Sequence, residues 1–262
     1  MLEDENISVS LSQGLRPYME DTYIVDKITK RQGKDIKILA VFDGHGGDSV
    51  SNMLKDEFIP HLKKLLLRSP EINICLRKAF LDLDNQSKPI GFSTGSTAVV
   101  IVMKENELYI ANCGDSEAMM GYKNKNIKIL SERHKVEDEK SRLVSLGAEI
   151  TYDDPCARIN HTLNLARSIG DHYLKQFVIS TPYIRLIKIN KNVEYIIIAS
   201  DGLWDVYDYK TLQNEIQELK HRFESEGKNK TEITDAIGFE LVKRALLRGS
   251  TDNITIILHF LE

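Results

Sequence analysis

Hydrophobic residues along this chain fall into two patterns: short apolar runs typical of strands, and longer stretches in which apolar residues recur at helical spacing. The predicted strands cover residues 7–11, 22–26, 36–42, 97–103, 107–113, 117–123, 127–130, 184–189, 195–200 and 254–261. The predicted helices cover residues 47–67, 70–84, 136–146, 209–224 and 232–247. Residues 148–180 show neither period and are predicted to be irregular.

The order of these elements predicts the fold class. Strands come in hairpin-length blocks joined by short polar turns, such as residues 105–106 and 124–125, and helices come in pairs between the blocks. A parallel sheet would need strands and helices to alternate. The pattern therefore favours an α+β fold, an α/β/β/α sandwich of two antiparallel sheets flanked by paired helices. The continuously apolar strand 195–199 fits a sheet that is covered on both faces.

Composition narrows the possible functions. The 262 residues are 42% hydrophobic, which is enough for a large core, and we expect one domain over residues 1–262 because no repeat or linker interrupts the pattern. The net charge of −4 argues against nucleic acid as a partner. No apolar run reaches membrane-spanning length, and no signal peptide is visible. Three scattered cysteines indicate a reducing compartment. We expect a cytoplasmic or nuclear protein, monomeric and not bound to membranes.

Acidic residues mark the places where predicted strands meet turns. Asp43 and Asp201 each follow an apolar strand and precede glycine, while Asp252 stands just before the last strand. Asp115 follows the strand 107–113, and Asp205 lies one helical turn after Asp201. A single Asp-Gly pair is usually a structural turn. Several carboxylates converging from distant segments suit a hard divalent cation, and glycine allows the backbone to approach it closely. The pattern therefore indicates metal-assisted hydrolysis.

Other polar residues near these aspartates have simpler interpretations when taken alone. An isolated Arg16 would be a solvated surface charge, and His45 between glycines would be a turn residue. The pair Gly46-Gly47 could suggest a phosphate-binding loop, but no Gly-Lys-Ser/Thr follows, so a nucleotide P-loop is not expected.

Seven short motifs give a more specific indication. In chain order they are Arg16-Pro17-Tyr18-Met19-Glu20-Asp21, Asp43-Gly44-His45-Gly46-Gly47, Thr94-Gly95-Ser96-Thr97-Ala98, Asn112-Cys113-Gly114-Asp115-Ser116, residues 163–171, residues 199–205 and Ser250-Thr251-Asp252-Asn253-Ile254-Thr255. Together they resemble, in the same order, the motifs of the protein phosphatase 2C family. The resemblance runs from about residue 7 to residue 261. It implies a serine/threonine phosphatase acting on phosphorylated proteins, on an α/β sandwich that agrees with the pattern above.

The resemblance also implies a centre of two Mg²⁺ or Mn²⁺ ions. Asp43 would bridge the ions, the Gly44 carbonyl would bind one, Asp201 and Asp252 would bind the other, and Glu20 would hold a metal-bound water. Asp115 and Asp205, with Asp201, match the position of a weaker third ion. Two cations that share a water lower the pKa of that water and produce a hydroxide nucleophile at neutral pH.

The resemblance assigns roles to three further residues. Arg16 would clamp the phosphate, because a guanidinium offers a planar fork to its oxygens. His45 would act as general acid toward the leaving serine or threonine oxygen. Asp21 would orient a water or His45.

Four positions depart from the family pattern. Glu117 replaces a basic residue, Arg133 and Val136 replace the Asp and Pro of Asp-His-Lys-Pro, and His161 replaces a glycine. Three of them lie in residues 133–172, the segment that matches the family's flap beside the active site. None is an implied metal ligand, so we expect chemistry to survive and substrate preference or regulation to differ. A catalytically silent pseudophosphatase scaffold and a small-phosphoester hydrolase such as a nucleotidase remain the alternatives.

Overall fold

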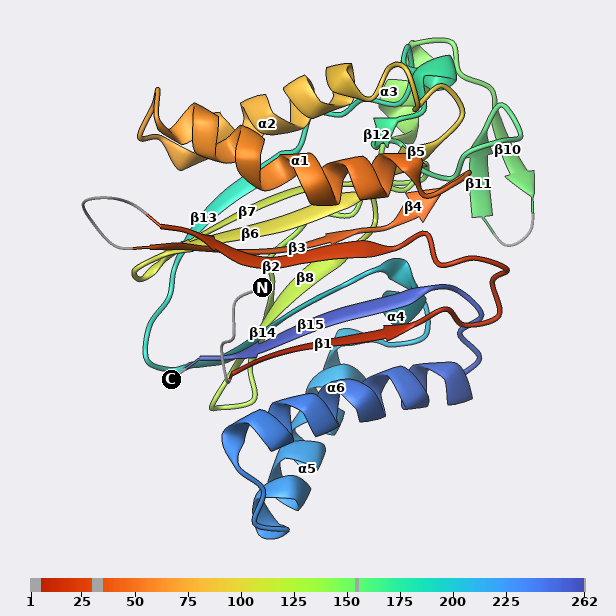
Figure 1. Ribbon diagram of the computed structural model, residues 1–262. Coiled ribbons are helices and arrows are strands. Elements are labelled where there is room, and N and C mark those ends of the chain that lie inside the picture. The colour runs from red at the N-terminus through yellow and green to blue at the C-terminus, as the bar shows by residue number, and fades with distance from the viewer. Residues whose placement is uncertain (1–5, 30–34, 154–155, 262) are drawn as a thin grey trace.

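The computed structural model describes residues 6–29, 35–153 and 156–261, and within these ranges two five-stranded antiparallel sheets pack face to face (Figure 1). The first sheet has the order β13-β7-β6-β3-β2. Its strands are β13 (Tyr183–Lys188), β7 (Glu107–Cys113), β6 (Ala98–Lys104), β3 (Ile36–Phe42) and β2 (Thr22–Ile28). The second sheet has the order β1-β15-β14-β8-β9. Its strands are β1 (Ile7–Ser12), β15 (Ile254–Phe260), β14 (Val193–Ala199), β8 (Glu117–Tyr122) and β9 (Ile127–Ile129).

Paired helices cover the outer face of each sheet (Figure 1). α1 (Ser49–Leu66) and α2 (Ile72–Gln86) lie on the first sheet, while α5 (Tyr209–Ser225) and α6 (Lys230–Leu247) lie on the second. α6 begins with a capping box in which Asn229 and Glu232 satisfy each other's backbone amides. The predicted sandwich of two antiparallel sheets between paired helices is confirmed. Among the described helices, none is long and apolar enough to span a membrane.

Strand alternation explains why the layers stack as they do. In β3, Leu39 and Val41 face the core between the sheets, whereas Ile38, Ala40 and Phe42 face the helices α1 and α2. β14 is buried along its whole length, as its unbroken apolar sequence predicts for a strand covered on both faces. Both faces of each sheet are therefore packed against apolar layers. Polar groups are accommodated mainly at the ends of the strands.

A small third sheet carries the chain across one end of the sandwich. It has the order β12-β5-β4, with β4 (Gly44–His45), β5 (Gly95–Ser96) and β12 (Ile169–Gly170). β4 pairs Gly44 with Ser96, and β12 pairs Gly170 with Gly95. This sheet joins the turn that follows β3 to the flap segment 133–172.

The flap segment differs from the sequence prediction. A helix was predicted from residue 136, but α3 covers only Lys140–Ser145, because the Val136 amide donates to the Asn164 carbonyl and Lys135 forms a bridge with Leu165. The prediction that residues 148–180 are irregular is also wrong in part. They contain the hairpin of β10 (Ile150–Asp153) and β11 (Cys156–Ile159), then β12 and a 3₁₀ turn at His172–Leu174. These pieces enclose their own small apolar core, which includes Val136, Leu143, Ile159 and Leu165.

Candidate active site

Three carboxylates meet at the end of the sandwich. Asp43 directly follows β3, Asp115 lies in the connection from β7 to β8, and Asp201 is the first residue of the short helix α4 (Asp201–Trp204) after β14. One ligand oxygen from each lies within 4.8 Å of the other two. The two sheets thus bring acids separated by up to 158 positions in the chain to one point. The sequence prediction had grouped Asp252 with Asp43 and Asp201; the structure adds Asp115 to this pair, and the charge of Asp252 also acts on both Asp43 and Asp201.

The electrostatics of this group indicate a cation site. Burial, reinforced by the charges of Asp21 and Asp201, raises the pKa of Asp43 well above its ordinary value. Burial and the charges of Asp115 and Asp205 do the same to Asp201. Like charges at this separation are costly unless positive charge compensates them. Oxygen donors alone, closely spaced and partly buried, fit Mg²⁺ or Mn²⁺.

Asp21 lies behind the three carboxylates. Its side chain is buried, and its Oδ2 accepts a hydrogen bond of 2.8 Å from the Ser200 hydroxyl, which fixes the carboxyl group beside the start of α4. Burial, aided by the charge of Asp252, raises the pKa of Asp21 to about 6 despite this hydrogen bond. The charge of Asp21 adds to burial in raising the pKa of Asp43. Its contacts therefore connect it with the carboxylates of the centre.

Lys135 supplies a positive charge at the edge of the group. Its ammonium lies 2.9 Å from Asp205 Oδ1 and 3.6 Å from Asp115 Oδ2, and only 19% of its side chain is exposed. These two acids raise the pKa of Lys135, outweighing the opposite effect of burial. The position between Asp115 and Asp205, where the sequence predicts an accessory ion, is therefore bordered by an ammonium group of the protein.

Arg16 reaches the centre from the loop after β1. Its guanidinium lies 2.6 Å from Asp252 Oδ2, and the two side chains are 54% and 34% exposed. The Leu15 amide donates to the Thr251 carbonyl at 2.9 Å and holds this loop against the residues before β15. Gly14 has a positive φ of 61°, and a Cβ there would lie 2.1 Å from the Asp252 carbonyl oxygen. Arg16 and Asp252 are thus placed together at the mouth of the centre.

The backbone of Glu20 and Gly44 is tightly packed. The Glu20 amide donates to Asn253 Oδ1 at 2.7 Å, and its carbonyl accepts from the Ser51 hydroxyl at 2.6 Å. A Cβ on Gly44 would lie 2.6 Å from that same carbonyl oxygen, so no side chain fits at Gly44. This packing fixes the turn after Asp43. The Glu20 carboxylate is outside the group of three.

His45 has a partner that the sequence interpretation missed. Its Nε2 lies 2.7 Å from Oδ2 of Asp171, a buried carboxylate that also accepts a hydrogen bond from the Ser168 hydroxyl. These contacts lower the pKa of Asp171, outweighing burial, the largest single influence. Asp171 closes the motif 163–171, and its backbone is left-handed at φ 49°. Its acidity and its place in a motif were the only signals available in the sequence.

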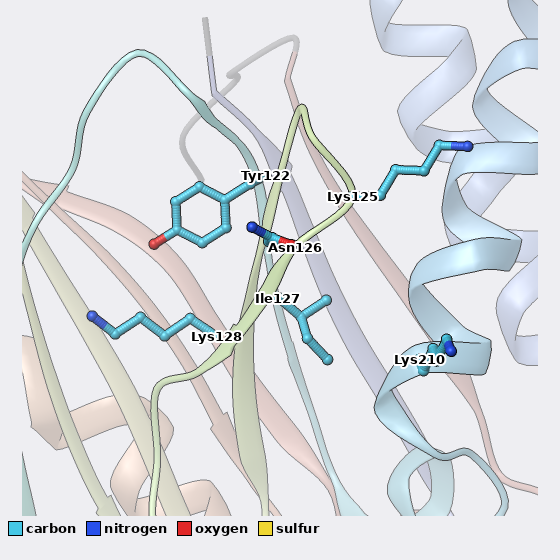
Figure 2. A pocket seen from close by; sticks show the side chains of 6 residues that line it. All are labelled: Tyr122, Lys125, Asn126, Ile127, Lys128 and Lys210. Carbon is cyan, nitrogen blue, oxygen red and sulfur yellow. The ribbon is translucent and has the colours of Figure 1, made fainter.

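One hollow on the described surface is lined by none of these residues. It has a volume of about 580 Å³ and surrounds the hairpin of β8 and β9, lined by Tyr122, Lys125, Asn126, Ile127, Lys128 and Lys210 (Figure 2). Tyr122 and Lys128 point to one side of the hairpin, while Lys125 and Ile127 point to the other. The lysines do not converge on one point, so we assign the chemistry to the acidic centre.

Comparison with known proteins agrees with this geometry. The model of the family described as Protein phosphatase 2C matches residues 5–254. The chain belongs to the protein phosphatase 2C family.

Curated relatives agree with this assignment. It is 35% identical over 271 aligned residues to "Probable protein phosphatase 2C 52" of Oryza sativa subsp. japonica, covering 98% of this chain and 51% of the relative. It is 32% identical to "Probable protein phosphatase 2C 76" of Arabidopsis thaliana, covering 94% and 56%. The chain therefore spans little more than half the length of these two relatives.

Solved structures show the same fold. The serine-threonine phosphatase 2C from Toxoplasma gondii aligns with a TM-score of 0.78 at 22% identity, covering 98% of this chain and 94% of that one. A C. elegans sex determining protein aligns with a TM-score of 0.81 at 24% identity, covering 98% and 64%.

Two of the departures from the family pattern, Glu117 and Arg133, carry opposite charges that act on each other. Glu117 is buried at the start of β8 and accepts a hydrogen bond of 2.7 Å from the Tyr209 hydroxyl. Burial raises the pKa of Glu117, and the hydrogen bond from Tyr209 and the charge of Arg133 oppose that rise. The charges of Asp138 and Glu117 in turn raise the pKa of Arg133 despite its burial. The base and acid usual at these positions are thus exchanged together, so charge balance is preserved.

The other two departures keep the local structure. Val136 is fully buried in the small core of the flap, where a proline would lack the amide that donates to Asn164. His161 has φ 60°, so it retains the left-handed backbone that a glycine adopts without strain. Arg167, in the same segment, contacts the Glu139 carboxylate and the Thr181 carbonyl. All three residues act on the flap's own structure.

Proposed function

We propose that this chain is a Mg²⁺- or Mn²⁺-dependent serine/threonine phosphatase that hydrolyses phosphoserine and phosphothreonine in proteins. Membership of the protein phosphatase 2C family supports the reaction class. The observation that carries the proposal is the convergence of Asp43, Asp115 and Asp201 within 4.8 Å, with Arg16 close to the neighbouring Asp252. An acidic centre alone would repel a phosphate, so a cation and a guanidinium are both needed to bind it.

The metal ligands in this proposal are Asp43, Asp201 and Asp252 with the Gly44 carbonyl, and Glu20 through a water. Asp115 is included because it lies beside Asp43 and Asp201. Asp205 would be a ligand of an accessory ion. Bound Mg²⁺ or Mn²⁺ would supply an acidified water as nucleophile and would neutralise the charge that develops on the phosphate. The carboxylates of this chain fix where those charges can sit, because both sheets hold them rigidly.

Arg16 would bind the phosphate oxygens. About half of its side chain is exposed, and its present partner Asp252 belongs to the proposed ligand set. When Asp252 is engaged elsewhere, the guanidinium fork is available for two phosphate oxygens in the plane that it favours. The ion pair therefore keeps Arg16 near the position where substrate arrives.

His45 would deliver a proton to the leaving oxygen of serine or threonine. Asp171 and Ser168 hold the imidazole from the flap side, since Asp171 contacts Nε2 and is itself fixed by the Ser168 hydroxyl. Such a carboxylate fixes the orientation of the ring. Asp21 supports the centre through Ser200, and we assign it a positioning role.

The experiment compares purified protein with and without Mn²⁺, using para-nitrophenyl phosphate and a phosphothreonine peptide. We expect Mn²⁺-dependent turnover of both, stopped by EDTA, and a loss on the order of 10³-fold in Asp201→Asn. Asp235→Asn, an exposed aspartate on α6, serves as the matched control and should keep full activity.

Two results would contradict the proposal. Turnover that survives EDTA, or that is normal in Asp201→Asn, would rule out the assigned mechanism. A folded protein that binds no Mn²⁺ in calorimetry and hydrolyses neither substrate would instead support a silent scaffold. Faster hydrolysis of nucleotides than of phosphopeptides would favour a small-phosphoester hydrolase.

A further inference from the structure

Three exposed apolar side chains lie in two adjoining loops that also hold Asp171, the partner of His45. Ile90 and Phe92 lie in the loop between α2 and β5, and Tyr173 lies in the 3₁₀ turn that follows β12. They are 43%, 67% and 37% exposed. The rings of Phe92 and Tyr173 are tilted against each other at 49°, with centroids 6.2 Å apart. We call these three residues the aromatic ledge.

Backbone hydrogen bonds fix the ledge. The Tyr173 amide donates to the Phe92 carbonyl and the His172 amide donates to the Gly91 carbonyl, both at 3.0 Å. His172 Nε2 also lies 2.9 Å from the Ser87 hydroxyl at the end of α2. The two loops therefore form one unit, and the rings are presented to solvent from a rigid base.

The same two loops hold the proposed general acid. The Asp171 amide donates to the Thr94 carbonyl at 3.0 Å, and the Thr94 hydroxyl donates to the Gly46 carbonyl at 3.2 Å. Phe92 stands two residues before Thr94, and Tyr173 stands two residues after Asp171. Two residues of chain span at most about 7 Å. The ledge is thus joined to His45 and its turn by short, hydrogen-bonded connections.

Folding alone gives no reason for these rings to be exposed together. Single apolar side chains on a surface are ordinary, but adjoining aromatic residues at the rim of a site are typical of contact surfaces. Aromatic rings also bind at small entropic cost because few rotatable bonds have to be fixed. A rigid ledge next to a phosphate-binding centre would meet the residues that flank the phosphorylated one.

We propose that the aromatic ledge binds an apolar side chain of the phosphoprotein substrate, located two to four residues from the phosphorylated serine or threonine. This inference rests on the proposed function, because it takes its occupant from the substrate of that site. An extended peptide advances about 3.3 Å per residue, so side chains two to four positions away lie about 7 to 13 Å along it. That distance fits the short connections between the ledge and the turn around His45.

The experiment uses one phosphothreonine peptide in which a single leucine is moved through positions −4 to +4 of a serine-rich background. We expect the protein to favour leucine at one of the positions two to four residues from the phosphothreonine by about tenfold in kcat/KM, the effect of about 1.4 kcal/mol of binding. Phe92→Ala and Tyr173→Ala should lose that preference. Both variants should keep wild-type turnover of para-nitrophenyl phosphate, which is too small to reach the ledge.

Phe239→Ala is the matched control. Phe239 lies on α6, away from the flap, and is also 67% exposed. Its removal therefore reduces the exposed apolar surface as much as Phe92→Ala does. It should retain the leucine preference. The proposal is wrong if the leucine preference persists unchanged in Phe92→Ala and Tyr173→Ala. It is also wrong if the wild-type protein prefers leucine at no position.

The test separates this inference from the proposed function. If the wild-type protein does not hydrolyse para-nitrophenyl phosphate, the proposed function fails. Fluorescence anisotropy with the labelled leucine peptides then decides about the ledge. A weaker affinity in Phe92→Ala than in Phe239→Ala would support it, and equal affinities would overturn it.

Discussion

The acidic centre and the flap use charged residues in opposite ways. In the centre, Asp43 and Asp201 lie close to other carboxylates, and their pKa values are raised. In the flap, the Glu139 carboxylate contacts both Arg142 and Arg167. Arg142 also donates to the Phe177 and Ala166 carbonyls at 2.6 and 2.9 Å. The centre gathers carboxylates with Lys135 at its edge, whereas in the flap Glu139 is paired with two arginines.

This difference separates function from stability. Buried carboxylates without matching cations destabilise a metal-free fold, so their presence indicates a function that requires them. A paired carboxylate that bridges segments of chain holds those segments in place, and removing it leaves the partners unsatisfied. Substitutions in the two regions should therefore have opposite effects on the folded state.

Asp43→Asn should give the largest effect, and it should change activity and stability in opposite directions. We expect Mn²⁺-dependent turnover to fall on the order of 10³-fold, because the central carboxylate of the cation site is lost. The metal-free protein should become more stable, since the amide removes a buried charge from a group of like charges. Turnover with para-nitrophenyl phosphate and thermal unfolding in EDTA measure the two quantities.

The same unfolding experiment with Mn²⁺ completes the comparison. The wild-type protein should gain stability from the bound ion with the logarithm of the Mn²⁺ concentration above its Kd, and Asp43→Asn should gain much less. If Asp43→Asn unfolds at a lower temperature than the wild type in EDTA, the centre is not held under electrostatic strain and the comparison fails.

Glu139→Gln should have the next largest effect and the opposite sign. We expect a loss of about 3 kcal/mol in the free energy of unfolding, because Arg142 and Arg167 both lose a largely buried ionic partner. Amide hydrogen exchange should become faster in residues 156–167. Glu240→Gln is the control, since Glu240 pairs with the exposed Lys243 one turn away on α6 and should cost less than about 1 kcal/mol. Equal losses in the two variants would contradict the role of Glu139.

A pH series should reveal the smallest difference. The pKa of Asp21 is raised to about 6 in the fold, above its ordinary value of 3.8, so its stabilising contribution is present at low pH and is lost as pH rises through about 6. The lowered pKa of Asp171 has the opposite sign: its contribution is present above the unfolded pKa and is lost as pH falls through the folded value.

We therefore expect metal-free wild type to lose about 1 kcal/mol relative to Asp21→Asn between pH 5 and pH 7. Unfolding of both proteins in EDTA at each pH measures this difference. A constant difference across the range would show that Asp21 does not titrate there.

The sequence was sufficient to predict most of the sandwich. Strands such as Ile36–Phe42 and helices such as α5 follow from periodicity, because each has one or two faces buried against a large apolar layer. The flap was predicted less well. The hairpin β10–β11 is short. The rest of the flap is held by contacts between distant residues, such as Glu139 with Arg167, and such contacts leave no periodic signal in the sequence.

The site could be predicted in its chemistry but not in its grouping. Motifs identified Asp43, Asp115 and Asp201, yet only the fold shows that these three lie within 4.8 Å while Asp252 contacts Arg16. Asp171 and Lys135 lie in or beside recognisable motifs, but the motifs do not show which residues they contact. Their roles depend on segments brought together from positions 126 residues and 70 residues away in the chain.

The ammonium of Lys135, seated between Asp115 and Asp205, has a consequence for how the protein matures. A newly made chain has to collapse its sheets around a group of acids before any ion from solution has been bound. Here part of the neutralising charge is attached to the polypeptide, so it arrives together with the acids. The scaffold can thus close first and take up its metal afterwards.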